Sequence, residues 1–322
     1  MSRTYYLFSD GRLKRKDNTL AFESESGRRM VPVEDVDQIY CFSDMDLNTR
    51  LLEFLSQHHI CLHFFNHYGY YSGSFIPRES QLSGYLVVKQ VEHYLDSQKR
   101  LLLAQTFVEG ALHNIRRNLE KRELVEVCEK LDTYRKSIKP SKNVGELMSV
   151  EAHVRKAYYS VWNDITGWDF GERSKRPPQN ELNALISFGN ALTYTAVLKE
   201  IYHTALNPTI SYLHEPSERR YSLALDVSEL FKPVFVDRLI FRLINLKMIQ
   251  ENHFDKRVNS TYLNESGRKL FVQAFEDMME STILHRKLKR QIKYKNLIRL
   301  DLYKIIKHLL GDSQYSPMKV WW

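Results

Sequence analysis

The sequence predicts an α+β fold in which a small N-terminal β-sandwich is followed by a larger all-helical domain. Short runs rich in aromatic and β-branched residues, separated by turn residues, fill roughly the first 80 positions. Apolar residues then recur at three- and four-residue steps from Val87 to about Arg122. Glycine and proline nearly vanish where this helical pattern begins. We therefore expect a β-rich domain over residues 1–83 and a helical domain over residues 84–322.

The N-terminal elements follow from apolar runs and the turn residues between them. Asp10-Gly11 after the first run indicates a hairpin turn. Apolar residues at Leu51, Leu52 and Phe54 are typical of one short helix. The expected elements are strands over residues 4–8, 19–22, 29–33, 36–42 and 60–65 and a helix over residues 47–58.

The C-terminal part is expected to remain helical to its end. Its helical periodicity is interrupted by loops around residues 139–142 and over residues 167–179, where proline, glycine and charged residues gather. No internal repeat or low-complexity tract is present.

The composition favours a globular protein with an anionic partner. Of the 322 residues, 43% are hydrophobic and 27% are charged, as in ordinary soluble domains. At roughly 150 residues per domain, this length favours two domains. Lys and Arg number 47 against 39 Asp and Glu, for a formal charge of +8. Such a surplus favours DNA, RNA or anionic lipid as a partner without proving one.

The cysteines and the N-terminus indicate a cytoplasmic protein. Cys41, Cys61 and Cys128 are far apart and show no CxxC spacing, so neither a zinc site nor a disulfide framework is supported. The first residues lack the apolar segment of a signal peptide. No apolar stretch approaches the ~18 residues of a membrane span. We expect reduced thiols and no membrane partner.

Glu151 is the first candidate for chemistry. It lies in a helical segment four residues before Arg155. The alternative to a catalytic role is that Glu151 only forms a surface ion pair with Arg155, because residues four apart are neighbours on a helix.

Asp226, Glu229 and His214 form the second set of candidates. The two acids are three apart and follow an apolar, strand-like run. If a helix begins at Asp226, the pair is either an ordinary capping box or a pair of carboxylates that can share a cation. His214 lies in a loop ahead of them, from which a tight turn could return it to the same place.

Together, Glu151, His214 and Glu229, with Asp226 close by, would make a site of carboxylates and one imidazole. Hard oxygen ligands with one nitrogen suit Mg²⁺ or Mn²⁺ better than Zn²⁺. Such an ion polarises a phosphoryl oxygen in phosphodiester chemistry. The absence of Walker A, GxGxxG and GxSxG motifs weakens nucleotide hydrolysis by a P-loop, Rossmann redox chemistry and α/β-hydrolase chemistry.

Two basic clusters are candidates for DNA contact. Residues 286–307 are strongly basic with interleaved apolar residues, which predicts an amphipathic helix with one face free for phosphates. A loop over residues 173–178 is the second cluster. A solvated surface would explain either cluster equally simply. The candidate DNA-binding residues are Arg286, Lys287, Lys289, Arg290 and Lys293 in the first and Arg173, Lys175 and Arg176 in the second.

These residues resemble the CRISPR spacer-integrase family (CRISPR-associated protein one) over nearly the whole chain. The most specific part is residues 176–178, RPP, with residues 183–190, NALISFGN. That block is similar to a family signature that ends in tyrosine, where this chain has Asn190. The tail over residues 315–322 is also similar to the family. Residues 5–13, YYLFSDGRL, resemble the form found beside type I-B effector systems.

Three shorter segments carry the resemblance to the family's catalytic residues. The helix with Glu151 is similar to the one that carries the family's first metal ligand, although Ala152 stands where glycine is usual. Leu213-His214 resembles the element with the imidazole ligand. Residues 222–233, SLALDVSELFKP, resemble the element with the remaining acids, with Lys232 in place of arginine.

The resemblance implies that Glu151, His214 and Glu229 bind Mg²⁺ or Mn²⁺ and that Asp226 supports catalysis. It implies a metal-dependent endonuclease and integrase that inserts captured foreign DNA into a CRISPR array as new spacers. In the implied reaction, the 3′-hydroxyl of the fragment would attack a phosphodiester of double-stranded or branched DNA. The N-terminal domain would serve dimerisation and partner contacts. The implied assembly is a heterohexamer-type complex of homodimers with a small ferredoxin-like adaptation protein.

Two other functions remain open on the residues alone. One is a non-catalytic DNA- or RNA-binding protein that uses its basic C-terminal segment. The other is a scaffold in which the acids only cap and pair. A divalent metal separates them from the enzyme, because neither binding nor scaffolding depends on one.

Overall fold

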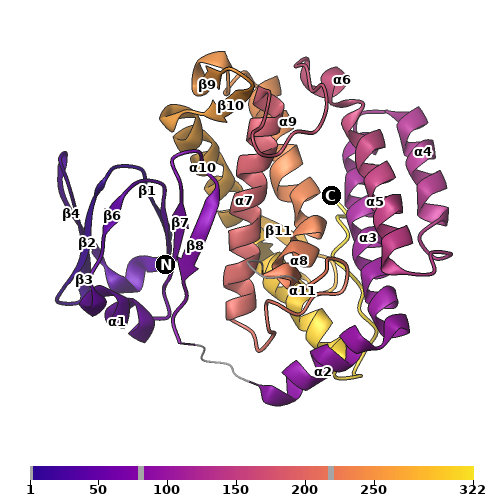
Figure 1. Cartoon of the computed structure of the whole chain (residues 1–322), viewed down its shortest axis with the longest axis horizontal. Coiled ribbons are helices and arrows are strands. Elements are labelled where there is room, and N and C mark those ends of the chain that lie inside the picture. The colour runs from indigo at the N-terminus through magenta and orange to yellow at the C-terminus, as the bar shows by residue number, and fades with distance from the viewer. Residues whose placement is uncertain (1–2, 79–82, 217–220) are drawn as a thin grey trace.

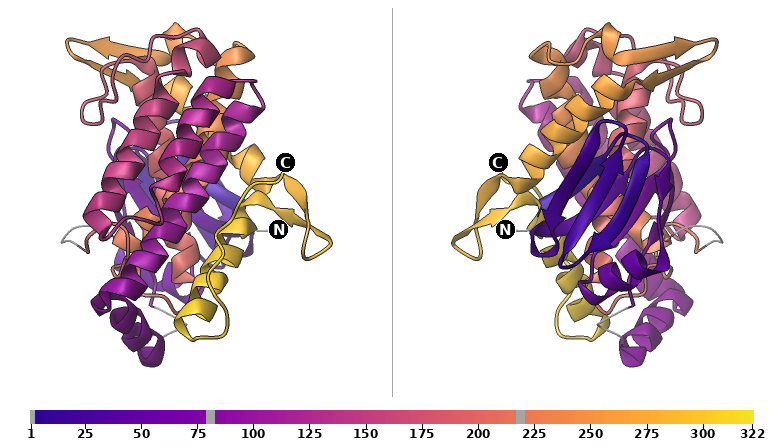
Figure 2. Two further views of the ribbon diagram at one scale, coloured as in Figure 1. Left: turned by 90° about the vertical axis from the view of Figure 1, so that its right-hand side faces the viewer. Right: turned by 90° about the vertical axis from the view of Figure 1, so that its left-hand side faces the viewer.

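The N-terminal part is a sandwich of two four-stranded sheets (Figure 1; Figure 2, right). In the first sheet, ordered β1-β5-β7-β8, the first three strands are parallel and β8 is antiparallel to β7. The second sheet is ordered β4-β3-β2-β6. The computed structural model describes residues 3–78, 83–216 and 221–322. The elements of this part are β1 (Arg3–Leu7), β2 (Gly11–Lys16), β3 (Thr19–Ser24), β4 (Gly27–Pro32), β5 (Val36–Cys41), β6 (Met45–Asp46), α1 (Thr49–Gln57), β7 (Cys61–Phe65) and β8 (Tyr71–Phe75).

The first sheet is buried on both faces, because successive side chains of a strand point to opposite sides. Ile39 and Cys41 of β5 join a core shared with the second sheet and α1. Tyr40 and the following Phe42 face the helices instead. The hydroxyl of Tyr40 accepts a hydrogen bond from Thr195 Oγ1 of α7 over 3.2 Å. The chain therefore stacks in three layers: second sheet, first sheet and helices.

The hairpin predicted at Asp10-Gly11 is wrong. The strands on either side of it lie in different sheets, since β1 pairs with β5 while β2 pairs with β3 and β6. Asp10 instead accepts a hydrogen bond from the backbone N–H of Asp44 over 3.0 Å, at the crossing between the sheets. The hairpin turn lies between β2 and β3, where Asp17 adopts a positive φ of 54°.

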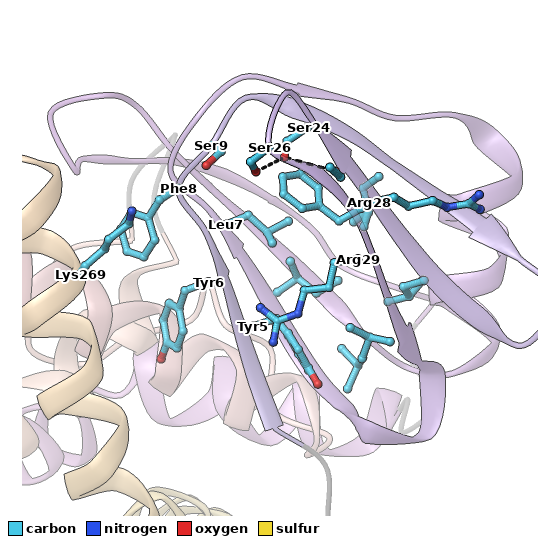
Figure 3. A pocket seen from close by; sticks show the side chains of 17 residues that line it. Tyr5, Tyr6, Leu7, Phe8, Ser9, Ser24, Ser26, Arg28, Arg29 and Lys269 are labelled. Atoms are coloured by element: carbon cyan, nitrogen blue, oxygen red, sulfur yellow. Dashed lines mark hydrogen bonds between the residues drawn. The ribbon is translucent and has the colours of Figure 1, made fainter.

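A cavity of about 330 Å³ opens between the two sheets. In Figure 3, Tyr5 and Leu7 of β1 point toward it and Arg29 of β4 lies across from them, while Tyr6 points to the other side of β1. None of the predicted catalytic or DNA-binding residues lines this cavity. It is therefore separate from the candidate site.

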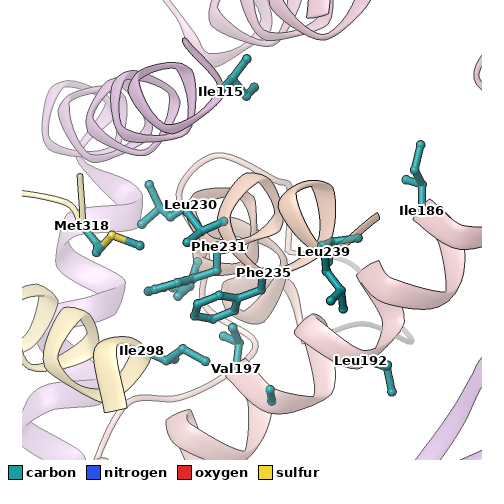
Figure 4. Close-up of a cluster of buried hydrophobic side chains, with 14 of the residues drawn as sticks. Ile115, Ile186, Leu192, Val197, Leu230, Phe231, Phe235, Leu239, Ile298 and Met318 are labelled. Carbon is teal, nitrogen blue, oxygen red and sulfur yellow. The ribbon is translucent and has the colours of Figure 1, made fainter. Parts of the chain in front are cut away.

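The second part is built around α7 and the helical run from α8 to α9. Side chains of α7 are buried all round it, as expected of a helix in the middle of a bundle. Residues of α3, α8, α9 and α11 meet α7 in one apolar cluster (Figure 4). The helices are α2 (Gly84–Leu95), α3 (Ser97–Glu120), α4 (Val125–Lys136), α5 (Val144–Tyr159), α6 (Trp162–Thr166), α7 (Glu181–Tyr202), α8 (Ser222–Lys232), α9 (Arg238–Asn245), α10 (Glu265–Glu280) and α11 (Tyr294–Leu309).

The predicted fold class is confirmed, with two additions. The hairpins β9 (Phe254–Arg257)–β10 (Ser260–Leu263) and β11 (Thr282–His285)–β12 (Arg290–Lys293) interrupt the helices. None of the helices in the described part of the chain has the length and apolar character of a membrane span. Cys41, Cys61 and Cys128 are buried and unpaired.

Gly189 explains one position of the RPP…NALISFGN block. A Cβ atom at Gly189 would lie 2.5 Å from Cγ1 of Val236 and 3.0 Å from Cζ of Phe271. A glycine is therefore needed where α7 approaches the segment between α8 and α9.

Folding stability should fall on mild acidification because of His63. This ring is fully buried in β7 and bonded through Nδ1 to Ser74 Oγ over 2.6 Å. Burial, with the nearby charge of Lys199, lowers the pKa of His63 to about 3. The unfolded chain, with a histidine pKa of about 6.5, therefore takes up the proton first, and stability is lost as the pH falls below that value. Between pH 7 and pH 5 we expect a loss of about 2 kcal/mol from this group.

Urea denaturation of the wild type and of His63→Gln at both pH values measures this effect. The variant should lose less stability than the wild type over the interval. Equal losses in the two proteins would show that His63 is not the group responsible.

Candidate active site

Helix α5 presents Glu151 and Arg155 one turn apart. Arg155 Nε donates to Glu151 Oε1 over 2.9 Å, so the ion pair considered from the sequence is present. A second N–H of Arg155 donates to Glu229 of α8. The three side chains are largely buried, with 14%, 21% and 13% exposure for Arg155, Glu151 and Glu229. One arginine thus joins two predicted metal ligands from two helices.

The capping-box alternative for Asp226 and Glu229 is excluded, because no helix begins at Asp226. Helix α8 begins at Ser222 after Tyr221, which gives no side-chain cap. Asp226 and Glu229 therefore lie inside the helix and form no capping box. Their spacing of three residues still places them on one side of it.

Asp226 organises the loop that carries His214. It is fully buried, and its carboxylate accepts backbone N–H bonds from Tyr212, Leu213 and His214 at 2.7, 2.9 and 2.9 Å. It also binds Nδ1 of the His214 ring at 2.8 Å. Burial works against a charged imidazole, but the bond and charge of Asp226 outweigh it and raise the pKa of His214. Asp226 therefore fixes the loop and the ring together.

Glu229 is held as an anion. Burial alone would raise its pKa, but the charges of Lys232 and Arg155 overcome it and lower the pKa of Glu229 to about 2. Lys232, one turn further along α8, bonds to the other carboxylate oxygen. Glu229 is thus ionised at any physiological pH, as a metal ligand must be.

The donor set suits a hard divalent cation. Asp226 binds Nδ1 of His214, so that Nε2 is the ring nitrogen that could bind a metal, as is typical of metal-binding histidines. Glu151 and Glu229 could supply two oxygen ligands. As placed, however, no three His, Cys, Asp or Glu side chains of the described residues form a group ready to hold one ion. Arg155 lies between Glu151 and Glu229 instead.

The loop after α6 divides its basic residues between two roles. Arg173 is tied to α7 through Asn183 Oδ1 at 2.9 Å and Ser187 Oγ at 3.1 Å. Lys175 and Arg176 are exposed, and the charges of Glu229 and Glu151 act on Lys175. The structure therefore brings Lys175 near the candidate site and makes Arg173 part of the scaffold.

The predicted basic helix is wrong for residues 286–293. Arg286, Lys287 and Lys289 lie in the turn of the β11–β12 hairpin, and Arg290 and Lys293 lie on β12; the helix α11 begins only at residue 294. A positive φ of 53° at Lys289 makes the turn. Arg286, Lys287, Lys289 and Arg290 are exposed. Lys293 is bonded to Glu280.

Comparison with known proteins decides the family. A model of "CRISPR associated protein Cas1" matches residues 5–277. Over 320 residues, covering 99% of the chain and all of the relative, the chain is 74% identical to "CRISPR-associated endonuclease Cas1 2" of Moorella thermoacetica.

The chain belongs to the Cas1 family. A solved CAS1 protein of Thermotoga maritima, 44% identical, superposes with a TM-score of 0.90 over 98% of this chain and 100% of that one. Two structures that are 17% identical share the fold: a casposase bound to integration product, TM-score 0.86 over 99% and 94% of the two chains, and a Cas6-RT-Cas1–Cas2 complex, TM-score 0.84 over 99% and 36%.

Membership of the Cas1 family confirms the resemblance read from the sequence and the enzyme class with it, a CRISPR-associated endonuclease. Two of the segments that carry the resemblance, residues 213–214 and residues 222–233, meet in the fold. The element with the imidazole and the element with the two acids are joined by the bonds of Asp226 to the His214 loop.

The sequence reasoning missed Asp237. This acid is 2% exposed and lies in the π-helical segment Pro233–Asp237, which continues α8 into α9. The sequence does indicate that Asp237 is unusual, since it is a lone acid in the mostly apolar run from Phe231 to Phe241. Buried acids are rare unless they are paired.

Proposed function

We propose that the chain is a metal-dependent DNA endonuclease and integrase that joins captured DNA fragments to a CRISPR array as new spacers. The observation that carries this is that Arg155 links Glu151 to Glu229, while the His214 ring is held by Asp226 and feels the charge of Glu229, in a chain of the Cas1 family. A casposase of the same fold has been solved bound to integration product, which is consistent with strand transfer.

The residues of the candidate site have different roles in the proposed attack on a phosphodiester. Glu151, Glu229 and Nε2 of His214 would hold Mg²⁺ or Mn²⁺, which polarises the phosphodiester and stabilises negative charge on its oxygens. Asp226 keeps the His214 ring in one tautomer and orientation. Lys175, beside the site, can attract the DNA backbone. A 3′-hydroxyl as nucleophile gives integration, and water gives cleavage.

The partners are also proposals, and they rest on the same family membership. We expect double-stranded and branched DNA as substrates and a cytoplasmic homodimer formed through a domain over residues 1–83. A small ferredoxin-like protein would complete a heterohexamer-type complex with the catalytic domain over residues 84–322. The solved Cas1–Cas2 complex of the same fold supports such a partner.

The exposed turn of the β11–β12 hairpin is expected to contact DNA phosphates. Reversing two of its charges in Lys289→Glu/Arg290→Glu should weaken DNA binding. The slope of log K against log salt should become shallower by about 0.9 per lost phosphate contact. Fluorescence anisotropy over a salt series measures both effects.

A matched control changes the net charge equally, on helix α4 instead of the hairpin. Lys130→Glu/Lys136→Glu alters two exposed lysines of α4. If the control pair flattens the slope as much as the hairpin pair does, the effect is one of net charge and the hairpin is not a DNA contact.

The function is tested with a labelled branched DNA, with and without Mn²⁺, on the wild type and Glu151→Ala. We expect cleavage and strand transfer that require Mn²⁺ and disappear in the variant, while DNA affinity persists. His153→Ala is the control, since this exposed residue lies on the same helix and is bonded to the backbone of Ser149. No product from the wild type, even with the partner protein, would leave the non-catalytic DNA- or RNA-binding function.

A further inference from the structure

The guanidinium of Arg155 takes the place where the two glutamate ligands would bind a cation. It donates to Glu151 and to Glu229 at the same time. An ion that draws Glu151 and Glu229 together must displace this guanidinium, because both cannot lie between the same two carboxylates. Deprotonation cannot remove the competitor, since arginine keeps its charge at all physiological pH values.

A displaced arginine needs another partner. Arg155 is only 14% exposed, and a buried charge that loses its partner is costly. Its new acceptor must lie within reach of the same side chain, because α5 is fixed in the bundle.

Asp237 supplies such an acceptor. Its Oδ2 is buried and has no hydrogen-bond partner among the described residues. Its charge acts on Arg155, and that of Arg155 acts on it. A buried oxygen without a partner calls for an explanation, and π-helical turns such as the one that carries Asp237 are often found at functional sites.

Asp237 also has a reason to remain a poor partner until Arg155 arrives. Burial raises its pKa to about 7, although the charge of Arg155 and a hydrogen bond with the hydroxyl of Tyr158 oppose this. A guanidinium that moves closer would stabilise the ionised form. Arg155 and Asp237 therefore attract one another more strongly once a cation has bound Glu151 and Glu229.

We propose that Arg155 is a resident counter-ion that exchanges Glu151 and Glu229 for Asp237 when a divalent cation binds. This rests on the proposed function, because it takes the two glutamates as metal ligands. Arg155 keeps two neighbouring carboxylates together before the metal arrives, and Asp237 stabilises the displaced guanidinium afterwards. Both are positioning residues that set the metal affinity of the site.

Mn²⁺ affinity tests the exchange without reference to activity. Free Mn²⁺ is followed by electron paramagnetic resonance during titration of the full chain. Arg155→Met should bind Mn²⁺ roughly tenfold more tightly, because the competing charge is gone. Asp237→Asn should bind it several-fold more weakly, because Arg155 has nowhere to go. The double variant should match Arg155→Met, since Asp237 matters only through Arg155.

A change of Mn²⁺ affinity in the opposite direction overturns the proposal. If Arg155 merely positions the glutamates, Arg155→Met binds Mn²⁺ more weakly than the wild type. If Asp237→Asn weakens binding equally with and without Arg155, the two residues are not partners. Arg155→Gln repeats the comparison should the methionine variant not fold. Arg135→Met, which breaks a similar double contact with Glu109 on another face, should leave Mn²⁺ affinity unchanged.

His214→Ala separates this proposal from the proposed function. Mn²⁺ binding that is lost in His214→Ala and not tightened in Arg155→Met leaves the metal site standing and removes the exchange. Mn²⁺ binding that is unchanged in His214→Ala places the ion elsewhere and removes both.

Discussion

Replacing His214 with alanine is expected to lower metal-dependent cleavage and strand transfer by about a thousandfold or more, equivalent to about 4 kcal/mol. On the proposed function, the ring would supply the nitrogen ligand, and alanine removes it. Asp226 already holds Nδ1 and three backbone N–H groups of the same loop. The variant keeps those backbone bonds, so the fold and the DNA-binding surface should persist while the metal is lost.

Single-turnover kinetics on labelled branched DNA measure the rate, and fluorescence anisotropy measures DNA affinity. His93→Ala is a suitable control, because that ring is bonded to the backbone of Lys89 on α2. A rate for His214→Ala near that of the wild type would remove this residue from the ligand set. A parallel loss of rate and DNA affinity would make His214 part of the binding surface.

The candidate ligands could be predicted from the sequence because each lies in a short segment that resembles the Cas1 family. The contact that joins them could not be predicted. Arg155 and Glu229 are 74 positions apart, and only the packing of α5 near α8 brings them together. The i+4 pair with Glu151 was visible locally. The contact of Arg155 with Glu151 could therefore be predicted from the sequence, and its contact with Glu229 could not.

Local patterns failed where tertiary contacts decide the structure. The apolar spacing of residues 286–307 is typical of a helix, yet its first residues form a hairpin. Asp226 shows the same limit of local patterns, because aspartate is a common residue at the N-terminus of a helix. In the fold it lies inside α8 and makes four bonds to the His214 loop. The parallel pairing of β1 with β5 joins strands that have three strands of the other sheet between them in the sequence.

Asp226→Asn should damage stability and metal binding together. One oxygen of Asp226 accepts from Tyr212 and Leu213, and the other accepts from the backbone and ring of His214. An amide can replace only one of these oxygens as an acceptor, and its NH₂ group would face two N–H donors. We expect a loss of about 3 kcal/mol of folding stability, since bonds to a charged acceptor are worth about 1.5–3 kcal/mol each.

The same change should lower metal affinity, because it releases the ring that presents Nε2. Loss of such a supporting carboxylate typically costs about 10–100-fold in metal affinity or activity. Urea denaturation and Mn²⁺ titration measure the two effects at a temperature where the variant is folded.

Asp301→Asn provides the matched control. Asp301 is also fully buried, and it accepts from Tyr315 Oη over 2.6 Å and pairs with Lys304 on α11. Its replacement should lower stability and leave Mn²⁺ affinity unchanged, because it touches none of the candidate ligands. If Asp226→Asn behaves in the same way, Asp226 is only a scaffold for the loop. If it loses metal affinity as well, the carboxylate acts on the site through His214.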